Sequence, residues 1–231
     1  MPALPQREKP ELLDLHAGNL PEVRRSLGDI RRINTYLGGA KPVCDAVWNL
    51  IGDAKSATVL DIGTGNADIP LRLVQQAQSC GVDLQVIGLD INPRHLQIAR
   101  EDTANRDDIS LLGADAFALP LRDKSVDVVI STLFLHHFRA GEIRALLGEF
   151  SRVARIGWTM HDQVRDALPL WFFRLARPVL ARSYLTRYDA VASIYRAYTP
   201  TEMREIVAPI AGATVATSFP YRMSVNWRRG D

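Results

Sequence analysis

Residues 59–70 read VLDIGTGNADIP, and this stretch decides the fold that the sequence predicts. An apolar run ends in Asp61, and Gly63 and Gly65 follow two residues apart. Glycines directly after a strand let the backbone approach a ligand that a Cβ atom would exclude. A dinucleotide-binding loop carries a third glycine in this pattern, but Asp68 stands at that position. The stretch therefore predicts a strand, a tight turn and a helix around a ligand that tolerates acidic neighbours.

Short apolar runs alternate with helical periodicity from residue 57 to the C-terminus. The runs that predict strands are residues 58–62, 84–90, 109–114, 126–132, 157–162, 213–219 and 221–227. Amphipathic stretches that predict helices lie at residues 68–79, 93–104, 140–154 and 199–212. Continuous apolar strands that alternate with helices indicate a parallel sheet covered on both faces. The sequence thus predicts a doubly wound, Rossmann-like α/β fold with an antiparallel edge near Pro220.

The remaining segments predict a helical cap on this core. Residues 1–54 form an expected N-terminal cap with helices at 19–37 and 42–51, and residues 55–231 form the expected core. The first 18 residues are charged and Pro-rich, and we expect them to be loose. Residues 163–198 are too long for a connecting loop and too apolar for disorder, so they predict a helical insertion.

The composition excludes several classes of function. A formal net charge of +2 gives no overall field that favours nucleic acid, and the hydrophobic content of 47% is ordinary for a globular domain. No apolar run approaches the ~18 residues of a membrane span, and the N-terminus shows no apolar region of a secretory signal. Cys44 and Cys80 lack metal-ligand spacing. These features predict reduced thiols, a cytoplasmic protein and no metal site.

The acidic residues around the glycine turn discriminate between cofactors. Asp61 and Asp68 would each repel a dinucleotide pyrophosphate by roughly 1 kcal/mol. S-adenosylmethionine has no phosphate and carries a net positive charge, so the same acids favour it. Asp90 ends the second predicted strand, where a carboxylate accepts ribose hydroxyls of either cofactor. The sequence favours S-adenosylmethionine, with an NAD-dependent oxidoreductase and a non-catalytic cofactor-binding module as the other classes.

Four stretches together resemble a known family. VLDIGTGNADIP, GLDIN, GADAFALPLRDKSVDVVIS and LFLHHF are similar to class I S-adenosylmethionine-dependent methyltransferases, most strongly to the group with the quinone-biosynthesis enzymes. The resemblance covers roughly residues 55–160. It implies seven strands in the order 3-2-1-4-5-7-6 with one strand antiparallel. Residues 152–158, RVARIGW, depart from the Lys-Pro-Gly-Gly turn that quinone C-methyltransferases carry before the fifth strand.

The resemblance also implies which residues contact the cofactor. It places the methionine part at Asp61, Gly63 and Gly65, the ribose at Asp90, the adenine at Ile91, Asp115 and Ala116, and the sulfonium side at Ser131 or Thr132.

Histidines at the predicted carboxyl edge are candidates for catalysis. His136 and His137 follow the fourth strand, and we expect His137 to act on the acceptor. His161 ends the fifth strand as a second candidate base, and Asp162 would orient it or bind the acceptor. The predicted reaction is methyl transfer to a small hydrophobic, aromatic acceptor. O-methylation of a phenolic or polyketide-like compound comes first, and C-methylation of a quinol is the alternative.

The insertion carries an unusual cluster of aromatic and basic residues. Residues 168–185 read LPLWFFRLARPVLARSYL, with Trp171, Phe172 and Phe173 next to three arginines. Three interpretations are open: a helix that packs on the core, a lid over the acceptor, or a basic amphipathic surface that touches anionic lipid.

Overall fold

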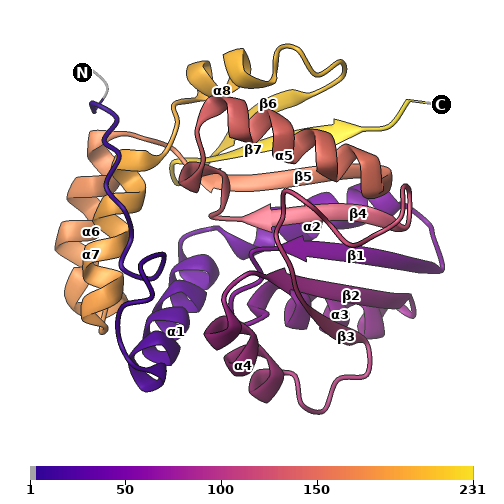
Figure 1. Cartoon of the computed structure of the whole chain (residues 1–231), viewed down its shortest axis with the longest axis horizontal. Helices are drawn as coiled ribbons and strands as arrows, with labels where there is room; N and C mark the ends of the chain where they lie inside the picture. Colours follow the sequence, from indigo (N-terminus) through magenta and orange to yellow (C-terminus); the bar gives the residue numbers. More distant parts are fainter. Residues whose placement is uncertain (1–3, 231) are drawn as a thin grey trace.

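The computed structural model describes residues 4–230, and its centre is one seven-stranded sheet (Figure 1). The strands are β1 (Ser56–Ile62), β2 (Asp83–Asp90), β3 (Ile109–Gly113), β4 (Val126–Thr132), β5 (Ala154–Gln163), β6 (Thr214–Ser218) and β7 (Arg222–Arg228). Their order across the sheet is β3-β2-β1-β4-β5-β7-β6. Among these strands β7 alone runs opposite to the other six, so its pairs with β5 and β6 are antiparallel and the remaining pairs are parallel. The order and the antiparallel strand confirm the predicted topology.

Helices cover both faces of the sheet (Figure 1). They are α1 (Leu20–Tyr36), α2 (Ala40–Ile51), α3 (Asp68–Cys80), α4 (Pro93–Asp102), α5 (Ala140–Val153), α6 (Ala167–Leu180), α7 (Tyr184–Arg196) and α8 (Pro200–Val207). On one face, Val47 of α2 and Leu73 of α3 are buried against the sheet. On the other face, Phe150 of α5 and Met203 of α8 are buried in a separate cluster. The doubly wound α/β architecture is therefore confirmed.

Successive strand residues contribute to opposite faces, and this alternation sorts the polar residues near the strand ends. In β5, Trp158 and Met160 belong to the cluster under α5 and α8, which places Asp162 on that face as well. His161 and Thr159 consequently project toward the α2 face. By the same rule, Asp61 of β1 projects toward the α2 face, because its neighbours Leu60 and Ile62 belong to the cluster under α5 and α8.

The strand order reverses at β1, because β2 pairs with one of its edges and β4 with the other. In sheets of this kind, a ligand binds in the crevice beyond the carboxyl ends of the strands at this reversal. The turn that follows β1 and the segment that follows β4 therefore lie at the same carboxyl edge, beside this reversal.

The predicted insertion is helical and forms the pair α6 and α7, at one end of the molecule beside α1 (Figure 1). Phe173 of α6 and Ile194 of α7 are buried in a cluster of their own, and Leu185 of α7 packs with Leu27 of α1. A short 3₁₀ helix, η1 (Leu135–His137), follows β4 and contacts α7. The insertion thus lies beside the segment that carries the paired histidines.

The N-terminal segment is bound to the insertion, which corrects the expectation that it is loose. The amide of Arg7 donates to the carbonyl of Tyr195, and the amides of Leu12 and Leu13 donate to the carboxylate of Asp189. Figure 1 shows this segment running along α6 and α7 toward α1. Met1 to Ala3, the start of the same stretch, lie outside the described residues.

The boundary predicted at residue 54 stays a prediction. Helix α2 precedes this boundary, yet its Val43 and Val47 are fully buried against β1 and β4. None of the helices within residues 4–230 is long and apolar enough to span a membrane.

Candidate cofactor and acceptor site

The glycine turn after β1 has the backbone conformation that its sequence demands. Gly63 has a φ of 70° and Gly65 a φ of 57°, both in the left-handed region that favours glycine. The amides of Gly63 and Thr64 donate to the carbonyl of Leu89 in β2, at 2.8 and 2.9 Å. These bonds fold the turn onto the end of β2, so the turn lies beside the carboxyl ends of both strands.

Two buried carboxylates accept hydrogen bonds from residues of the turn. Asp61 Oδ2 accepts a hydrogen bond from the Thr64 hydroxyl at 2.8 Å. Asp90 at the end of β2 accepts from the amide of Gly65 at 3.0 Å and from the amide of Asn92 at 2.8 Å. Four residues predicted to contact the cofactor, Asp61, Gly63, Gly65 and Asp90, are therefore brought together.

The electrostatics of the turn favour a cation. Burial raises the pKa of Asp61 to about 8, and the negative charges of Asp68 and Asp90 add to this shift. Burial also raises the pKa of Asp68, against the opposing charge of Arg72. Asp68 Oδ2 is buried and has no hydrogen-bond partner within residues 4–230. A positively charged group would relieve both carboxyls, whereas a phosphate would add repulsion.

The predicted adenine contacts lie along the neighbouring strand ends. Ile91 follows β2 and is 72% exposed, which leaves an apolar face open to a planar ring. Asp115 and Ala116 follow β3, which pairs with β2. The Asp115 carboxylate is exposed and accepts from the amide of Phe117, while Ala116 is buried.

Ser131 differs from the expectation. Its hydroxyl is completely buried and donates to the sulfur of Met160 at 2.9 Å, within the layer under α5. It therefore faces away from the side of the sheet that carries Asp61. The next residue, Thr132, keeps a buried hydroxyl with no hydrogen-bond partner in the described chain. Of the two alternatives for the sulfonium side, Thr132 has the free polar atom.

A cluster of histidines and carboxylates lies next to the turn, at η1. His136 Nδ1 is 2.8 Å from Asp162 Oδ1 of β5, and His136 Nε2 is 3.1 Å from Glu11 Oε1. His137 Nδ1 is 2.9 Å from Asp14 Oδ2. The cluster thus joins three distant parts of the chain: the N-terminal segment, η1 and β5. Glu11 and Asp14 are the two residues that the N-terminal segment contributes.

The charges of this cluster stabilise one another. Burial alone would lower the pKa of His136, but Asp162 and then Glu11 outweigh it and raise that pKa. Burial would raise the pKa of Asp162, and the charge and hydrogen bond of His136 hold it below its usual value instead. Arg196 of α7 donates to Asp14 and to the carbonyl of His137, which fixes the outer side of the cluster.

His161 lies outside this cluster. Its side chain projects to the opposite face of β5, where Nε2 lies 3.0 Å from the hydroxyl of Thr159. Burial, with a contribution from Arg222, lowers the pKa of His161 to about 4. The ring borders a cavity of about 560 Å³ between α2, β6 and β7. Of the two roles considered for Asp162, orientation of His161 is not observed, because these adjacent strand residues point to opposite faces and Asp162 binds His136.

Sequence reasoning missed Glu11 and Asp14 as members of the site. The signal that could have found them is the pattern ELLD at residues 11–14, where two leucines interrupt a charged, Pro-rich stretch. Leu13 is buried against α1 and α7, and this anchors the two acids that flank the leucine pair.

Comparison with known proteins agrees with this geometry. Residues 59–157 match the family model of the methyltransferase domain. A demethylmenaquinone methyltransferase of Staphylococcus epidermidis is 28% identical over 146 residues, which cover 60% of this chain and 58% of that protein. The chain therefore matches less than two thirds of the length of this relative.

Solved structures share the fold. A SAM-dependent methyltransferase from Aquifex aeolicus superposes with a TM-score of 0.62 at 19% identity, over 92% of this chain and 99% of that one. Human N-acetylserotonin methyltransferase, crystallised with SAM, gives a TM-score of 0.65 at 14% identity, over 95% of this chain and 62% of that one. At these identities the likeness concerns the fold.

Proposed function

We propose that this chain, which belongs to the class I S-adenosylmethionine-dependent methyltransferases, methylates a hydroxyl group of a small hydrophobic aromatic acceptor. The observation that carries the proposal is the arrangement at the carboxyl edge of the sheet, where the strand order reverses. There, two left-handed glycines meet the buried acids Asp61, Asp68 and Asp90. These buried carboxyls would be stabilised in their charged form by a sulfonium or an ammonium group.

Each part of the cofactor has a proposed partner. Asp61 and the glycine turn would hold the methionine part, and Asp90 would accept the two ribose hydroxyls with the lone pairs left by its backbone contacts. Ile91 offers its exposed side chain to the adenine, and Asp115 lies at the ring edge with Ala116. Thr132 replaces Ser131 on the sulfonium side, because its hydroxyl is the one without a partner.

S-adenosylmethionine supplies an already activated methyl group, so the main contribution of the protein is alignment of donor and acceptor. A phenol with a pKa of about 10 must also lose its proton as the bond to the methyl group forms. We assign this proton to Nε2 of His137. Its Nδ1 is held by Asp14, and the side chain keeps 21% of its surface exposed, whereas His136 is enclosed by Asp162 and Glu11.

Methylation of a quinol ring carbon is the second candidate. The relative named above is a demethylmenaquinone methyltransferase, and a ring carbon also releases a proton that the same cluster can receive. The departure at residues 152–158 from the turn of the quinone enzymes places this candidate second.

Calorimetry and an acceptor panel test the proposal together. S-adenosylhomocysteine should bind with one site per chain, and NAD should not bind. Methyl transfer from labelled S-adenosylmethionine is then measured over phenols and quinols, with the product identified as an ether or a C-methyl compound. Binding of NAD in place of the thioether would support an oxidoreductase. Cofactor binding without transfer to any acceptor would support a non-catalytic module.

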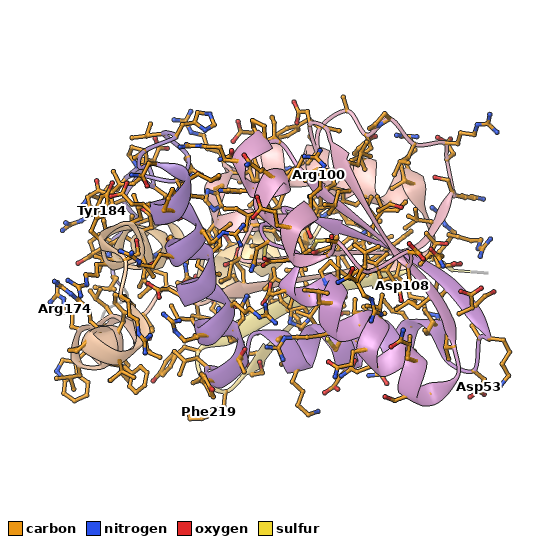
Figure 2. All side chains as sticks on the ribbon, turned by 90° about the horizontal axis from the view of Figure 1, so that it is seen from below. Asp53, Arg100, Asp108, Arg174, Tyr184 and Phe219 are labelled. Atoms are coloured by element: carbon orange, nitrogen blue, oxygen red, sulfur yellow. The ribbon has the colours of Figure 1, made fainter. Side chains whose placement is uncertain are left out.

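We also propose that the outer face of α6 contacts an anionic lipid surface, from which a hydrophobic acceptor is taken. Trp171, Leu175 and Val179 are 62%, 62% and 73% exposed and follow one another at helical spacing. Exposed Arg174 and Arg177 accompany them. Figure 2 shows Arg174 at the outer rim of the insertion, pointing away from the sheet. An apolar stripe with basic neighbours is the composition of an interfacial helix.

The same exposures argue against an aromatic lid made of all three adjacent rings. Phe173 packs inside the helix pair, while Trp171 and Phe172 face outward. A cytoplasmic location is part of the proposal. The two thiols, buried Cys44 and exposed Cys80, are both free, as expected in a reducing compartment.

A further inference from the structure

Three side chains of the histidine cluster point their ligand atoms at one spot. Glu11, His136 and His137 each offer one such atom, and the three atoms lie within 4.8 Å of one another. Glu11 Oε1 is 3.1 Å from His136 Nε2 and 3.9 Å from His137 Nε2. Both imidazoles therefore turn the same nitrogen toward the same carboxylate oxygen.

The orientation of each ring is fixed by a second carboxylate. Asp162 lies beside Nδ1 of His136, and Asp14 lies beside Nδ1 of His137. A carboxylate that accepts from Nδ1–H orients the ring as it does behind metal-bound histidines. Against the effect of burial, Asp162 and Glu11 raise the pKa of His136, so its Nε2 carries a proton in the ligand-free protein, and a bound ion would replace that proton. The two rings are tilted by 34° to each other with centroids 4.2 Å apart, so they lie side by side next to Glu11.

Hydrogen bonding alone does not explain the whole arrangement. One proton between His136 Nε2 and Glu11 Oε1 accounts for the 3.1 Å contact. The 3.9 Å from His137 Nε2 to the same oxygen is too long for a hydrogen bond. A cation between the three atoms would satisfy all of them.

We propose that Glu11 Oε1, His136 Nε2 and His137 Nε2 bind one divalent transition-metal ion, with Zn²⁺ as the best match. Two imidazoles and one carboxylate form a three-ligand set known from zinc sites with an open position, whereas Mg²⁺ and Ca²⁺ prefer oxygen ligands. Ligand atoms at ~2.1 Å from a tetrahedral ion lie ~3.4 Å apart. The observed 3.1 and 3.9 Å bracket this value, and the third pair of ligand atoms lies within 4.8 Å, so the side chains would have to close around the ion.

Such an ion would bind the N-terminal segment to η1, because Glu11 comes from the former and both histidines from the latter. In the methyl transfer proposed above, a bound ion would act as an inhibitor, because His137 Nε2 could not be a metal ligand and accept the proton of the acceptor at the same time. This last role rests on the proposed function. Metal binding itself does not depend on it.

Metal binding is measured on full-length protein without a polyhistidine tag, after treatment with a chelator and its removal. Titration with Zn²⁺ should show one ion per chain with a dissociation constant in the micromolar range or tighter. Co²⁺ should give the visible absorption of a four- or five-coordinate imidazole site. His137→Gln and Glu11→Gln should each weaken Zn²⁺ binding at least ~10-fold.

His16→Gln is the matched control, because His16 is exposed on the same N-terminal segment and lies outside the cluster. It should bind Zn²⁺ as the unmodified protein does. Near-ultraviolet circular dichroism of the metal-free proteins shows whether each variant is folded. The proposal is overturned if the unmodified protein binds no stoichiometric Zn²⁺, or if folded His137→Gln binds it equally well.

A parallel titration with S-adenosylhomocysteine separates this inference from the proposed function. Zn²⁺ binding without cofactor binding would sustain the metal site and remove the methyltransferase proposal. Cofactor binding without Zn²⁺ binding would remove the metal site and leave the methyltransferase proposal standing.

Discussion

The ring of Phe134 covers Gly63 so closely that a Cβ atom on Gly63 would lie 2.7 Å from Phe134 Cδ2. Phe134 also packs against Phe138, with ring centroids 4.9 Å apart, and the two residues flank η1 in the sequence. The glycine turn and the histidine cluster are thus joined through one aromatic side chain. A ligand that displaces the Phe134 ring at the turn would consequently also move the start of η1.

Gly63→Ala should destabilise the protein by ~2 kcal/mol, because it combines a left-handed backbone with a clash. In a Phe134→Ala background, whose own loss of stability is measured separately, Gly63→Ala should cost less, because the clash is gone and only the backbone strain remains. Unfolding in urea measures both. Gly148→Ala in α5 is the control, since nothing lies within 4 Å of its added Cβ, and it should be neutral or stabilising. Equal stability of Gly63→Ala and the unmodified protein would contradict the prediction.

Asp90→Ala should weaken binding of S-adenosylhomocysteine by roughly 30- to 100-fold, about 2–3 kcal/mol. The substitution removes the proposed ribose acceptor and also the partner of the Gly65 amide. Asp108→Ala serves as the control in the same calorimetric titration. Asp108 precedes β3 at the opposite edge of the sheet, where it pairs with Arg106. An unchanged dissociation constant for Asp90→Ala would remove this residue from the cofactor site.

The stability of the ligand-free protein should fall as the pH rises through the range set by Asp61. Its pKa is about 8 in the folded state against 3.8 for an unperturbed carboxyl. Between these values the folded protein holds a proton that the unfolded chain has released, so a higher pH favours unfolding. The contribution is at most about 1.4 kcal/mol per pH unit and levels off above the folded pKa. Asp61→Asn has no such proton.

Denaturation of both proteins from pH 5 to 9, a range chosen around the pKa of about 8, gives the difference in slope. The unmodified protein should lose more stability than Asp61→Asn over this range. Parallel curves would show that Asp61 is not held protonated.

His137→Gln should lower kcat for methyl transfer by ~10²- to 10⁴-fold in chelator-containing buffer, since it removes the proposed proton acceptor. His161→Gln should leave kcat unchanged, because His161 faces the opposite side of β5. Binding of S-adenosylhomocysteine should be equal in both variants, which excludes a folding defect. A loss of kcat in His161→Gln alone would reverse the assignment.

The unmodified protein should sediment with vesicles that contain phosphatidylglycerol, and more weakly as salt increases. Trp171→Ser combined with Leu175→Ser should reduce this binding ~10-fold or more, while stability changes by less than ~0.5 kcal/mol because both residues are exposed. Phe219→Ser is the control, an aromatic residue that is 90% exposed and lies away from α6 (Figure 2). Binding that persists in the double variant would move the lipid contact elsewhere.

Local patterns were sufficient for the sheet and for the cofactor turn. VLDIGTG combines an apolar strand with two glycines, which are the residues that adopt left-handed backbone conformations most easily. In the structure Gly63 and Gly65 both have such conformations in the turn after the strand. The carboxyl edge followed in the same way, because parallel strands in a doubly wound sheet end on one side. Asp61 and Asp90 could therefore be placed before their side-chain contacts were known.

The sequence by itself determined the order of strands and helices and the acids around the glycine turn, because these depend on spacing within short segments. Only the tertiary structure decided the partners of the histidines. Glu11 is 125 positions from His136, and Asp162 is 26 positions from it on the strand face that His161 does not share. Contacts across such separations depend on how elements pack, and Leu13 must first be buried before Glu11 and Asp14 can reach η1. Local periodicity carries no information about that packing.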